Sequence, residues 1–281
     1  MASISYDLVI IGGGLGGSTL AKVMAEHGAR VLVIEREKQF RDRVRGEAVS
    51  PWGAAEAKRL GVYDLLRDSC AFERRWALGL GPDRDLVTTT PQKLPSLTFY
   101  HPEMQEVILQ AAVRAGAEVR RGCAVISVAG GIPAELCFES DSKPERIQAR
   151  LVVGADGRGS SMRKLGNFTV RQDAQRMLLA GVFLEGLQGL REEACYFFVN
   201  PEIGQLAFLV GQRPGSARAY VGYRVESDFR LGRDSMPRFI EESIRCGIPA
   251  DVLRRQKLPA LWPRLAAPTA GWSTHIPTAL H

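Results

Sequence analysis

The chain has 281 residues, of which 45% are hydrophobic, and this is enough apolar material for a large buried core in one or two domains. The composition therefore excludes a chain that is disordered throughout. The net charge of +6 comes from scattered Lys and Arg residues without an aromatic-flanked basic patch, so we expect no nucleic-acid partner, and an anionic cofactor suffices for part of this charge.

The five cysteines are widely spaced, odd in number and never in a CxxC pair. This argues against a disulfide framework and against a zinc site, so we expect no metal and reduced thiols. The sequence has no signal-peptide pattern, and no apolar run approaches the length of a membrane span. We therefore expect a cytoplasmic protein without a membrane span.

The first predicted element is a βαβ unit. An apolar strand, Tyr6–Ile11, leads into the GxGxxG loop Gly12–Gly17, which opens a helix to His27. A second strand, Arg30–Ile34, ends at Glu35. A chain with 29 glycines can produce GxGxxG by chance as a surface turn, but a strand, a helix and an acid in register favour a dinucleotide site.

Each part of this motif has its own task. Gly12 permits the tight turn, Gly14 lets the backbone approach a pyrophosphate, and Gly17 lets the helix pack closely on the strand. Free N–H groups at the start of the helix suit phosphates, and Glu35 suits a ribose hydroxyl.

Helices and strands alternate through the middle of the chain. The predicted helices cover Ala54–Leu60 and Pro102–Ala115, and the predicted strands cover Glu118–Arg121, Ala124–Val128, Glu135–Glu139 and Ile147–Gly154. The last strand runs into the turn Asp156-Gly157 and a short helical stretch through Lys164. An Asp-Gly turn after a buried strand is common, so alone it is a weak signal.

From Met177 onward the pattern changes, after a polar segment at residues 171–176. Apolar runs separated by Gly, Pro and Asn predict an antiparallel sheet, with strands at Met177–Leu184, Ala194–Val199, Gln205–Val210 and Ala219–Val225. A helix is expected at Ser235–Cys246. Four polar side chains of this sheet face either a substrate or the packed interior, and packing is the more common role: Tyr196, Tyr220, Tyr223 and Arg224.

The order of these motifs resembles the class A flavin-dependent monooxygenases, the family of p-hydroxybenzoate hydroxylase and related aromatic hydroxylases, over about residues 5–265. The matching segments are Gly12–Gly17 with Glu35, Arg43–Glu47, the helix with Gln105 after His101, and Gly154–Arg163. The resemblance implies an α/β fold class, with a Rossmann-like FAD-binding domain over 1–175 and an inserted or following antiparallel β-sheet substrate domain over 176–263, whose sheet roofs the flavin ring.

The resemblance also implies which residues hold FAD: Gly12, Gly14, Leu15, Gly16, Gly17, Glu35, Arg36, Arg45, Gln105, Asp156 and Gly157. Arg45 would lie against the adenosine and pyrophosphate, whereas Arg43 is left open between this role and a solvated basic turn. His101 stands where the family usually has Arg or Gln, so a helix-capping role is equally compatible with it. Asp156 and Gly157 would touch the pyrophosphate region and the groove for NAD(P)H.

The implied activity is an FAD-dependent monooxygenase that uses NAD(P)H and oxygen to hydroxylate an aromatic or similar small organic substrate through a flavin C4a-hydroperoxide. The cofactor carries this chemistry, so no catalytic side chain is named. The WxWxIP segment of the flavin-dependent halogenases is missing. The alternatives are a non-catalytic truncated remnant with weak nucleotide binding, and a flavin reductase acting on isoprenoid double bonds. Substrate identity, NADH or NADPH preference and oligomeric state stay open.

The C-terminal segment departs from the family. The family's second flavin motif, Gly-Asp-Ala, is missing, and residues 264–281 show no periodicity. A reading frame shifted by one base permits Gly-Ala-Asp-Ser-Trp-Val-Glu-His-Pro-Tyr from Ala266 onward, similar to the segment many relatives carry just before that motif. This predicts a frameshifted tail and impaired activity; an ordinary irregular terminus is the alternative.

Overall fold

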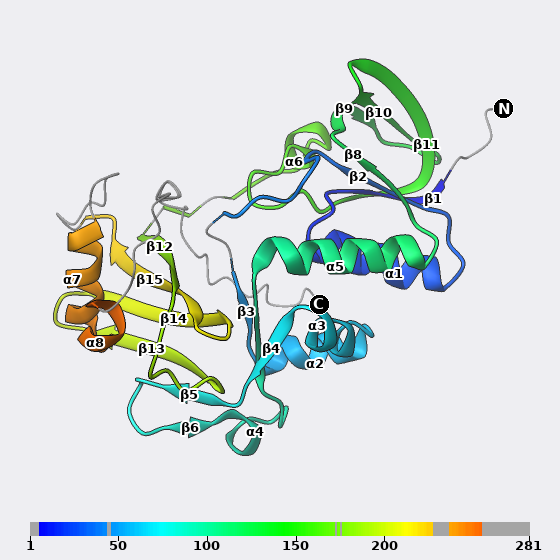
Figure 1. Cartoon of the computed structure of the whole chain (residues 1–281). Coiled ribbons are helices and arrows are strands. Elements are labelled where there is room, and N and C mark those ends of the chain that lie inside the picture. Colours follow the sequence, from blue (N-terminus) through cyan, green and yellow to red (C-terminus); the bar gives the residue numbers. More distant parts are fainter. Residues whose placement is uncertain (1–5, 44–45, 172, 175, 227–235, 255–281) are drawn as a thin grey trace. The chain divides into compact units, whose positions relative to one another are not determined.

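The structure of the chain, a computed structural model, describes residues 6–43, 46–171, 173–174, 176–226 and 236–254 (Figure 1). The segments with predicted roles at Arg45 and at 264–281 lie outside these residues. Contacts divide the chain into two compact units. Unit 1 comprises Met1–Asp42, Glu56–Cys70 and His101–Arg171, and unit 2 comprises Arg43–Ala55, Ala71–Tyr100 and Gln172–His281.

Unit 1 is built on a six-stranded sheet in the order β8-β2-β1-β11-β10-β9. The strands are β1 (Tyr6–Ile11), β2 (Val31–Glu35), β8 (Glu118–Arg121), β9 (Ala124–Ala129), β10 (Ala134–Ser140) and β11 (Lys143–Gly154). β1 pairs in parallel with β2 and with β11, and β2 pairs in parallel with β8. The last three strands form antiparallel pairs. The parallel part confirms the predicted βαβ unit.

Helices complete unit 1: α1 (Leu15–Glu26), α3 (Tyr63–Ser69), α5 (His101–Arg114) and α6 (Met162–Leu165). α1 and α5 contact each other, and both pack on one side of the sheet in a cluster that contains Ile10, Val33 and Leu109. Val9, directly before Ile10, and Ile34, directly after Val33, belong to a second cluster with Met162 of α6. Because successive strand residues point to opposite faces, this sheet is buried on both faces around β1 and β2.

Unit 2 is built on a second six-stranded sheet in the order β12-β15-β14-β13-β5-β6. Its strands are β12 (Met177–Glu185), β15 (Ser216–Arg224), β14 (Gln205–Arg213), β13 (Ala194–Asn200), β5 (Trp76–Leu78) and β6 (Arg84–Asp85). β12 to β15 pair antiparallel, which confirms the prediction for this region. β5 adds to the sheet in parallel with β13, although more than 100 residues separate the two in the sequence.

The other elements of unit 2 are a small sheet in the order β3-β7-β4 and three helices. Their bounds are β3 (Ala48–Val49), β7 (Ser96–Phe99), β4 (Ala71–Arg74), α4 (Leu86–Thr89), α7 (Met236–Cys246) and α8 (Ala250–Arg254). α2 (Pro51–Arg59) contributes residues to both units. Apolar residues of α7 and α8, including Phe239 and Leu253, form one buried cluster with Leu209 and Val221 of the large sheet.

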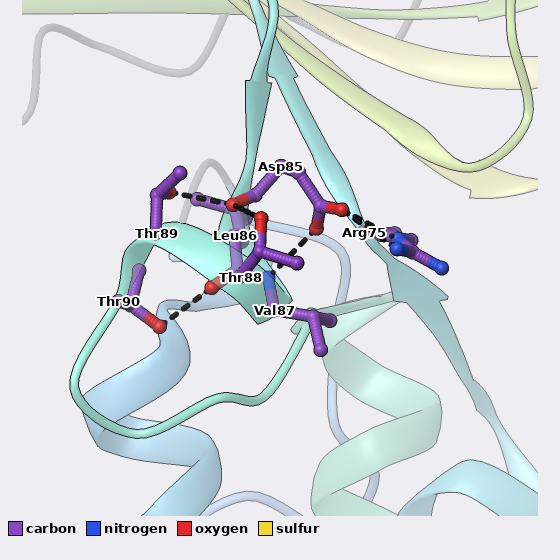
Figure 2. A network of polar contacts seen from close by, with 7 residues as sticks. All are labelled: Arg75, Asp85, Leu86, Val87, Thr88, Thr89 and Thr90. Atoms are coloured by element: carbon purple, nitrogen blue, oxygen red, sulfur yellow. Dashed lines mark hydrogen bonds and ion pairs between the residues drawn. The ribbon is translucent and has the colours of Figure 1, made fainter.

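The turn into α4 shows how short segments of unit 2 are fixed (Figure 2). The Asp85 carboxylate accepts the Val87 N–H at 3.0 Å as the helix cap and the Arg75 guanidinium at 2.7 Å. The Asp85 carbonyl accepts the hydroxyl of Thr89 at 2.5 Å, and Thr90 donates to the carbonyl of Leu86. An N-cap aspartate satisfies backbone donors that a helix start leaves unpaired, so this four-residue helix is stabilised locally.

Candidate nucleotide site in unit 1

Two of the predicted glycines are required by the fold itself. Gly12 has φ +107°, and a β-carbon there would lie 2.5 Å from the carbonyl oxygen of Ala155. A β-carbon on Gly17 would lie 2.0 Å from the carbonyl oxygen of Gly12. No side chain fits at these distances, so Gly12 permits a turn against the residue after β11, and Gly17 lets α1 pack against the end of β1.

The other two loop glycines meet little or nothing in the protein. A β-carbon on Gly14 would have only the Gln105 side chain within 4 Å, at 3.7 Å from Nε2, and one on Gly16 would have no neighbour. Gly14 is the N-cap of α1, and no side chain caps this helix or places an acid in its first turn. The open glycines and the unused N–H groups of this first turn therefore leave space and donors for an anion.

Glu35 supports the loop directly. Its carboxylate is buried and accepts the Gly13 N–H at 2.6 Å through one oxygen and the Glu37 N–H at 2.8 Å through the other. The sequence predicted a ribose acceptor and missed this structural task. Each carboxylate oxygen can accept a second hydrogen bond, so both tasks are compatible.

The Asp-Gly turn lies beside the glycine loop because β1 and β11 are neighbouring parallel strands. The Ala155 N–H donates to the Ile11 carbonyl at 2.7 Å, and Gly12 approaches Asp156 as well as Ala155. Gly157 has φ +79° and no neighbour within 4 Å of an added β-carbon. Two motifs more than 140 residues apart thus meet at the carboxyl ends of two strands, where ligands bind in open α/β sheets.

The two oxygens of Asp156 have different surroundings. Oδ2 accepts the backbone N–H groups of Ser161 at 2.7 Å and Met162 at 3.1 Å, and also the Ser161 hydroxyl, so it caps α6. Oδ1 is buried and has no hydrogen-bond partner among the residues that the structure describes. An unpaired buried carboxylate oxygen is costly, so Oδ1 is suited to accept a hydroxyl group of a bound ligand.

Capping also sets the charge state of Asp156. Burial acts to raise its pKa, but hydrogen bonds from Ser160, Met162 and Ser161 outweigh this and hold the pKa below its ordinary value of 3.8. A lowered folded-state pKa means that the unfolded chain binds more protons between the two pKa values. The stabilisation from ionised Asp156 is therefore complete above the unfolded pKa and is lost as the pH falls through the folded pKa.

Replacing Asp156 with asparagine should lower the free energy of unfolding at pH 7 by roughly 0.5–1 kcal/mol, because neutral acceptors bind backbone N–H groups less strongly. The difference between D156N and the parent chain should shrink as the pH falls below about 4, because the folded parent chain then takes up the proton that the unfolded chain already binds. Urea unfolding from pH 3 to pH 7 measures it. A difference that stays constant over this range would contradict the assignment.

The remaining predicted residues are less tightly placed. Gln105 lies on α5 beside Gly14, as given above. The Arg36 side chain is 74% exposed and lies 3.8 Å from the Glu37 carboxylate, directly after β2. α5 begins at His101. The structure thus gathers the glycine loop, Glu35, Gln105 and the Asp-Gly turn in unit 1.

In unit 2, a buried ionic cluster occupies residues whose roles the sequence left open. The Glu47 carboxylate accepts the Arg218 guanidinium through Nε at 2.9 and 3.0 Å and the Tyr220 hydroxyl at 2.5 Å, and the Glu47 side chain is fully buried. β15 also contains Arg224 and two tyrosines, so no sequence signal marked Arg218 as the partner of Glu47. Tyr223 and Tyr196 instead belong to the apolar cluster with α7, so they pack.

Other kinds of site find little support among the described residues. All five cysteines are buried and unlinked, and burial raises the pKa of Cys195 to about 12 despite nearby Arg74. The Cys195 thiol therefore stays protonated at neutral pH and is a poor nucleophile. Across the described part of the chain, His, Cys, Asp and Glu form no group of three that could hold a metal ion. A helix long and apolar enough to cross a membrane is likewise missing from the described segments.

Comparisons with known proteins identify the family of this chain. The family model described as "FAD binding domain" matches residues 5–250. Rifampicin monooxygenase of Streptomyces venezuelae is 29% identical over 57% of this chain and 33% of its own length. Digeranylgeranylglycerophospholipid reductase of Methanothrix thermoacetophila is 26% identical over 89% of this chain and 60% of its own.

A solved structure, p-nitrophenol 4-monooxygenase PnpA of Pseudomonas putida, shares the fold with a TM-score of 0.70 at 21% identity, over 89% of this chain and 64% of that one. The chain thus spans between a third and about two thirds of the length of these proteins. Because the family model covers most of the sequence and the glycine and Asp-Gly motifs meet in one site, the chain belongs to the FAD-binding family of class A FAD-dependent monooxygenases.

Proposed function

We propose that this chain binds FAD in unit 1 and hydroxylates an aromatic or similar small organic substrate with NAD(P)H and oxygen. The observation that supports this most is the meeting of Gly12–Gly17 with Asp156-Gly157, with an open Gly16, an uncapped α1 and an unpaired Asp156 Oδ1. These features fit a ligand that carries both phosphates and sugar hydroxyls, as FAD does.

Each residue has a defined part in this proposal. The first-turn N–H groups of α1, next to Gly14, would hold the pyrophosphate, and Glu35 would accept the adenosine ribose hydroxyls. Asp156 Oδ1 would accept a further hydroxyl, and Gln105 would contact the cofactor beside the glycine loop. Arg36 and Arg45 complete the proposed set. Bound flavin would supply the redox and oxygen chemistry, while the chain binds and orients it.

Gly14 offers a direct test, because alanine fits the protein but obstructs a ligand. Its φ is −73°, which any residue adopts, and the nearest atom to an added β-carbon is a flexible side chain. Gly14→Ala should change the free energy of unfolding by less than about 1 kcal/mol, yet weaken FAD binding by at least about tenfold. Equilibrium dialysis with FAD, visible flavin bands and urea unfolding measure these quantities. Equal FAD affinity in both chains would remove the glycine loop from the site.

Glu35→Gln tests the sugar end of the same site. The amide keeps one acceptor but turns an NH₂ group toward either the Gly13 or the Glu37 N–H, so a donor meets a donor. We expect a loss of about 1–3 kcal/mol in stability and a weaker affinity for ADP. Glu26→Gln, at an exposed i,i+4 ion pair with Lys22, is the control and should stay within about 0.5 kcal/mol. Unchanged ADP affinity in E35Q would exclude Glu35 from ligand binding.

A second candidate function has a specific observation in its favour. The digeranylgeranylglycerophospholipid reductase matches more of this chain than the rifampicin monooxygenase does, 89% against 57%. A reductase would transfer hydride equivalents to a double bond without consuming oxygen. With FAD and NADH or NADPH supplied, oxygen uptake stimulated by a phenolic substrate supports the hydroxylase, whereas anaerobic saturation of an isoprenoid double bond supports the reductase.

A further inference from the structure

Gln212 of β14 is a buried side chain of unit 2 in which both polar atoms are unpaired. It is 1% exposed, and within the described part of the chain neither its carboxamide nitrogen nor its carboxamide oxygen has a hydrogen-bond partner. Buried polar groups in folded proteins are almost always paired, because desolvation without a partner is costly. A fully unpaired buried carboxamide therefore points to a partner that the protein itself does not supply.

Two other buried polar residues of the same unit are paired, although Oε2 of Glu242 on α7 also lacks a partner among the described residues. Arg74 donates to Thr98 Oγ1 at 2.8 Å, to the Gly211 carbonyl at 3.0 Å and to the Glu192 carbonyl. Gln205, a buried glutamine at the start of the same strand, accepts the Cys246 thiol at 3.4 Å. The unpaired state of Gln212 is thus not a general property of this interior.

The backbone around Gln212 departs from regular strand pairing. Gly211 pairs with Ala217 and Arg213 pairs with Ser216, so Gln212 falls at an irregularity of the β14–β15 ladder. Such bulges re-aim a side chain and are frequent beside functional sites.

Both neighbours of Gln212 are held by other contacts. Arg74 binds the Gly211 carbonyl, and the Arg213 guanidinium lies 5.5 Å from the Tyr100 ring centre. Residues 213–215 are exposed, so the buried carboxamide lies one residue from the surface turn.

We propose that the Gln212 carboxamide is a specificity determinant that binds a ligand group presenting a hydrogen-bond acceptor next to a donor. A primary amide, a protonated carboxylic acid or a carbonyl beside a hydroxyl has this pattern and satisfies Nε2 and Oε1 together. This assignment rests on the proposed function, and it narrows the substrate to a polar molecule, since a hydrocarbon leaves both amide atoms unpaired.

Binding of three aromatic probes of similar size to the purified full chain tests whether Gln212 recognises an adjacent hydrogen-bond donor and acceptor. Benzamide offers an adjacent donor and acceptor, acetophenone offers an acceptor alone, and cumene offers neither. Binding is measured by calorimetry and by the shift in Tm, with and without FAD. We expect benzamide to bind at least about tenfold more tightly than cumene, with acetophenone between them.

Gln212→Met keeps the length of the side chain and removes both polar atoms. In Q212M the preference for benzamide over cumene should disappear. Gln205→Met is the matched control on the same strand: it should lose stability through its lost partner and keep the preference of the parent chain. Gln212→Asn, which retains the amide on a shorter stem, should keep part of the preference even if Q212M fails to fold.

An equal affinity of the parent chain for the three probes, or a preference that survives in Q212M, would overturn the proposal and leave a buried-water site as the explanation. These readouts need no turnover. A chain that fails to bind FAD but discriminates the probes through Gln212 would refute the proposed flavin function and support the recognition site. A chain that binds FAD but does not discriminate the probes would support the proposed FAD binding and refute the recognition site at Gln212.

Discussion

Replacing Gly17 with alanine should destabilise unit 1 by about 3 kcal/mol or more, one of the two largest effects that we expect. The added β-carbon would lie 2.0 Å from the Gly12 carbonyl oxygen, 3.1 Å from Ile10 and 3.2 Å from Ala155. The closest of these is a backbone atom of the glycine loop, which cannot rotate away as a side chain can. Helix α1 would have to move off β1, and the anion-binding turn would move with it.

Gly16→Ala is the matched control, one residue away in the same helix. No heavy atom lies within 4 Å of its added β-carbon, so stability should hold or rise by up to about 1 kcal/mol through the higher helix propensity of alanine. Urea unfolding of the ligand-free variants measures both effects. Similar stabilities for G17A and G16A would contradict the packing described for α1.

The Gly16→Ala variant also distinguishes an effect on ligand binding from an effect on protein stability. The space beside it is empty in the protein and lies where the proposed pyrophosphate would approach. We expect a G16A variant that folds well to bind FAD less tightly than the parent chain. For G17A, the loss of FAD binding follows from the displaced loop and should accompany the loss of stability.

The βαβ unit and the strands of residues 177–224 were predictable because their signals are local. The continuous apolar run of Tyr6–Ile11 predicts a buried strand. The glycine loop and Glu35 follow within the same supersecondary unit. β8 matches its predicted bounds, Glu118–Arg121, and α5 begins one residue before the predicted start at Pro102. In these segments, local pattern and tertiary packing favour the same structure.

Helix α2 (Pro51–Arg59) overlaps the predicted helix Ala54–Leu60, but the strands of the segment from 48 to 99 were not predictable in this way. Its strands are two to four residues long, and β5 pairs with β13 through a register that no local pattern encodes. By contacts, much of this segment belongs to unit 2, although its position in the sequence falls within the predicted domain 1–175. The functional boundaries at 175 and 263 stay predictions, since contacts divide a chain by packing alone.

The start of β11 is a second place where the sequence pattern did not predict the strand pairing. The predicted strand began at Ile147, whereas β11 begins at Lys143. Its first residues are charged or proline and pair with β10 across a turn in which Asp141 and Ser142 have positive φ. Strand pairing there depends on the neighbouring strand, which side-chain polarity does not reveal.

At the site, residue identities were predictable but their connections were not. The glycine pattern could be assigned residue by residue, since close backbone approach needs glycine. The hydrogen bond from Gly13 to Glu35 and the split roles of the two Asp156 oxygens depend on side-chain geometry. The pairing of Glu47 with Arg218 joins positions 171 residues apart, and only the folded sheet brings them together.

Replacing Arg218 with methionine should destabilise unit 2 by about 3–5 kcal/mol, because the buried Glu47 carboxylate loses its guanidinium partner. The Arg218 side chain is 4% exposed and that of Glu47 is 0% exposed, so water cannot easily replace the ion pair. Chemical unfolding of R218M and of the exposed control Arg245→Met, which should stay within about 0.5 kcal/mol, measures the effect.

A double-mutant cycle shows whether the lower stability of R218M comes from the unpaired, buried Glu47 carboxylate or from lost packing of the Arg218 side chain. Glu47→Met in the R218M background removes the buried carboxylate, and an apolar pair of similar volume often replaces a buried ion pair at little cost. We therefore expect E47M/R218M to be more stable than R218M. If the second substitution adds a further loss of similar size, the two side chains contribute independently through packing, and the ionic description of this cluster is wrong.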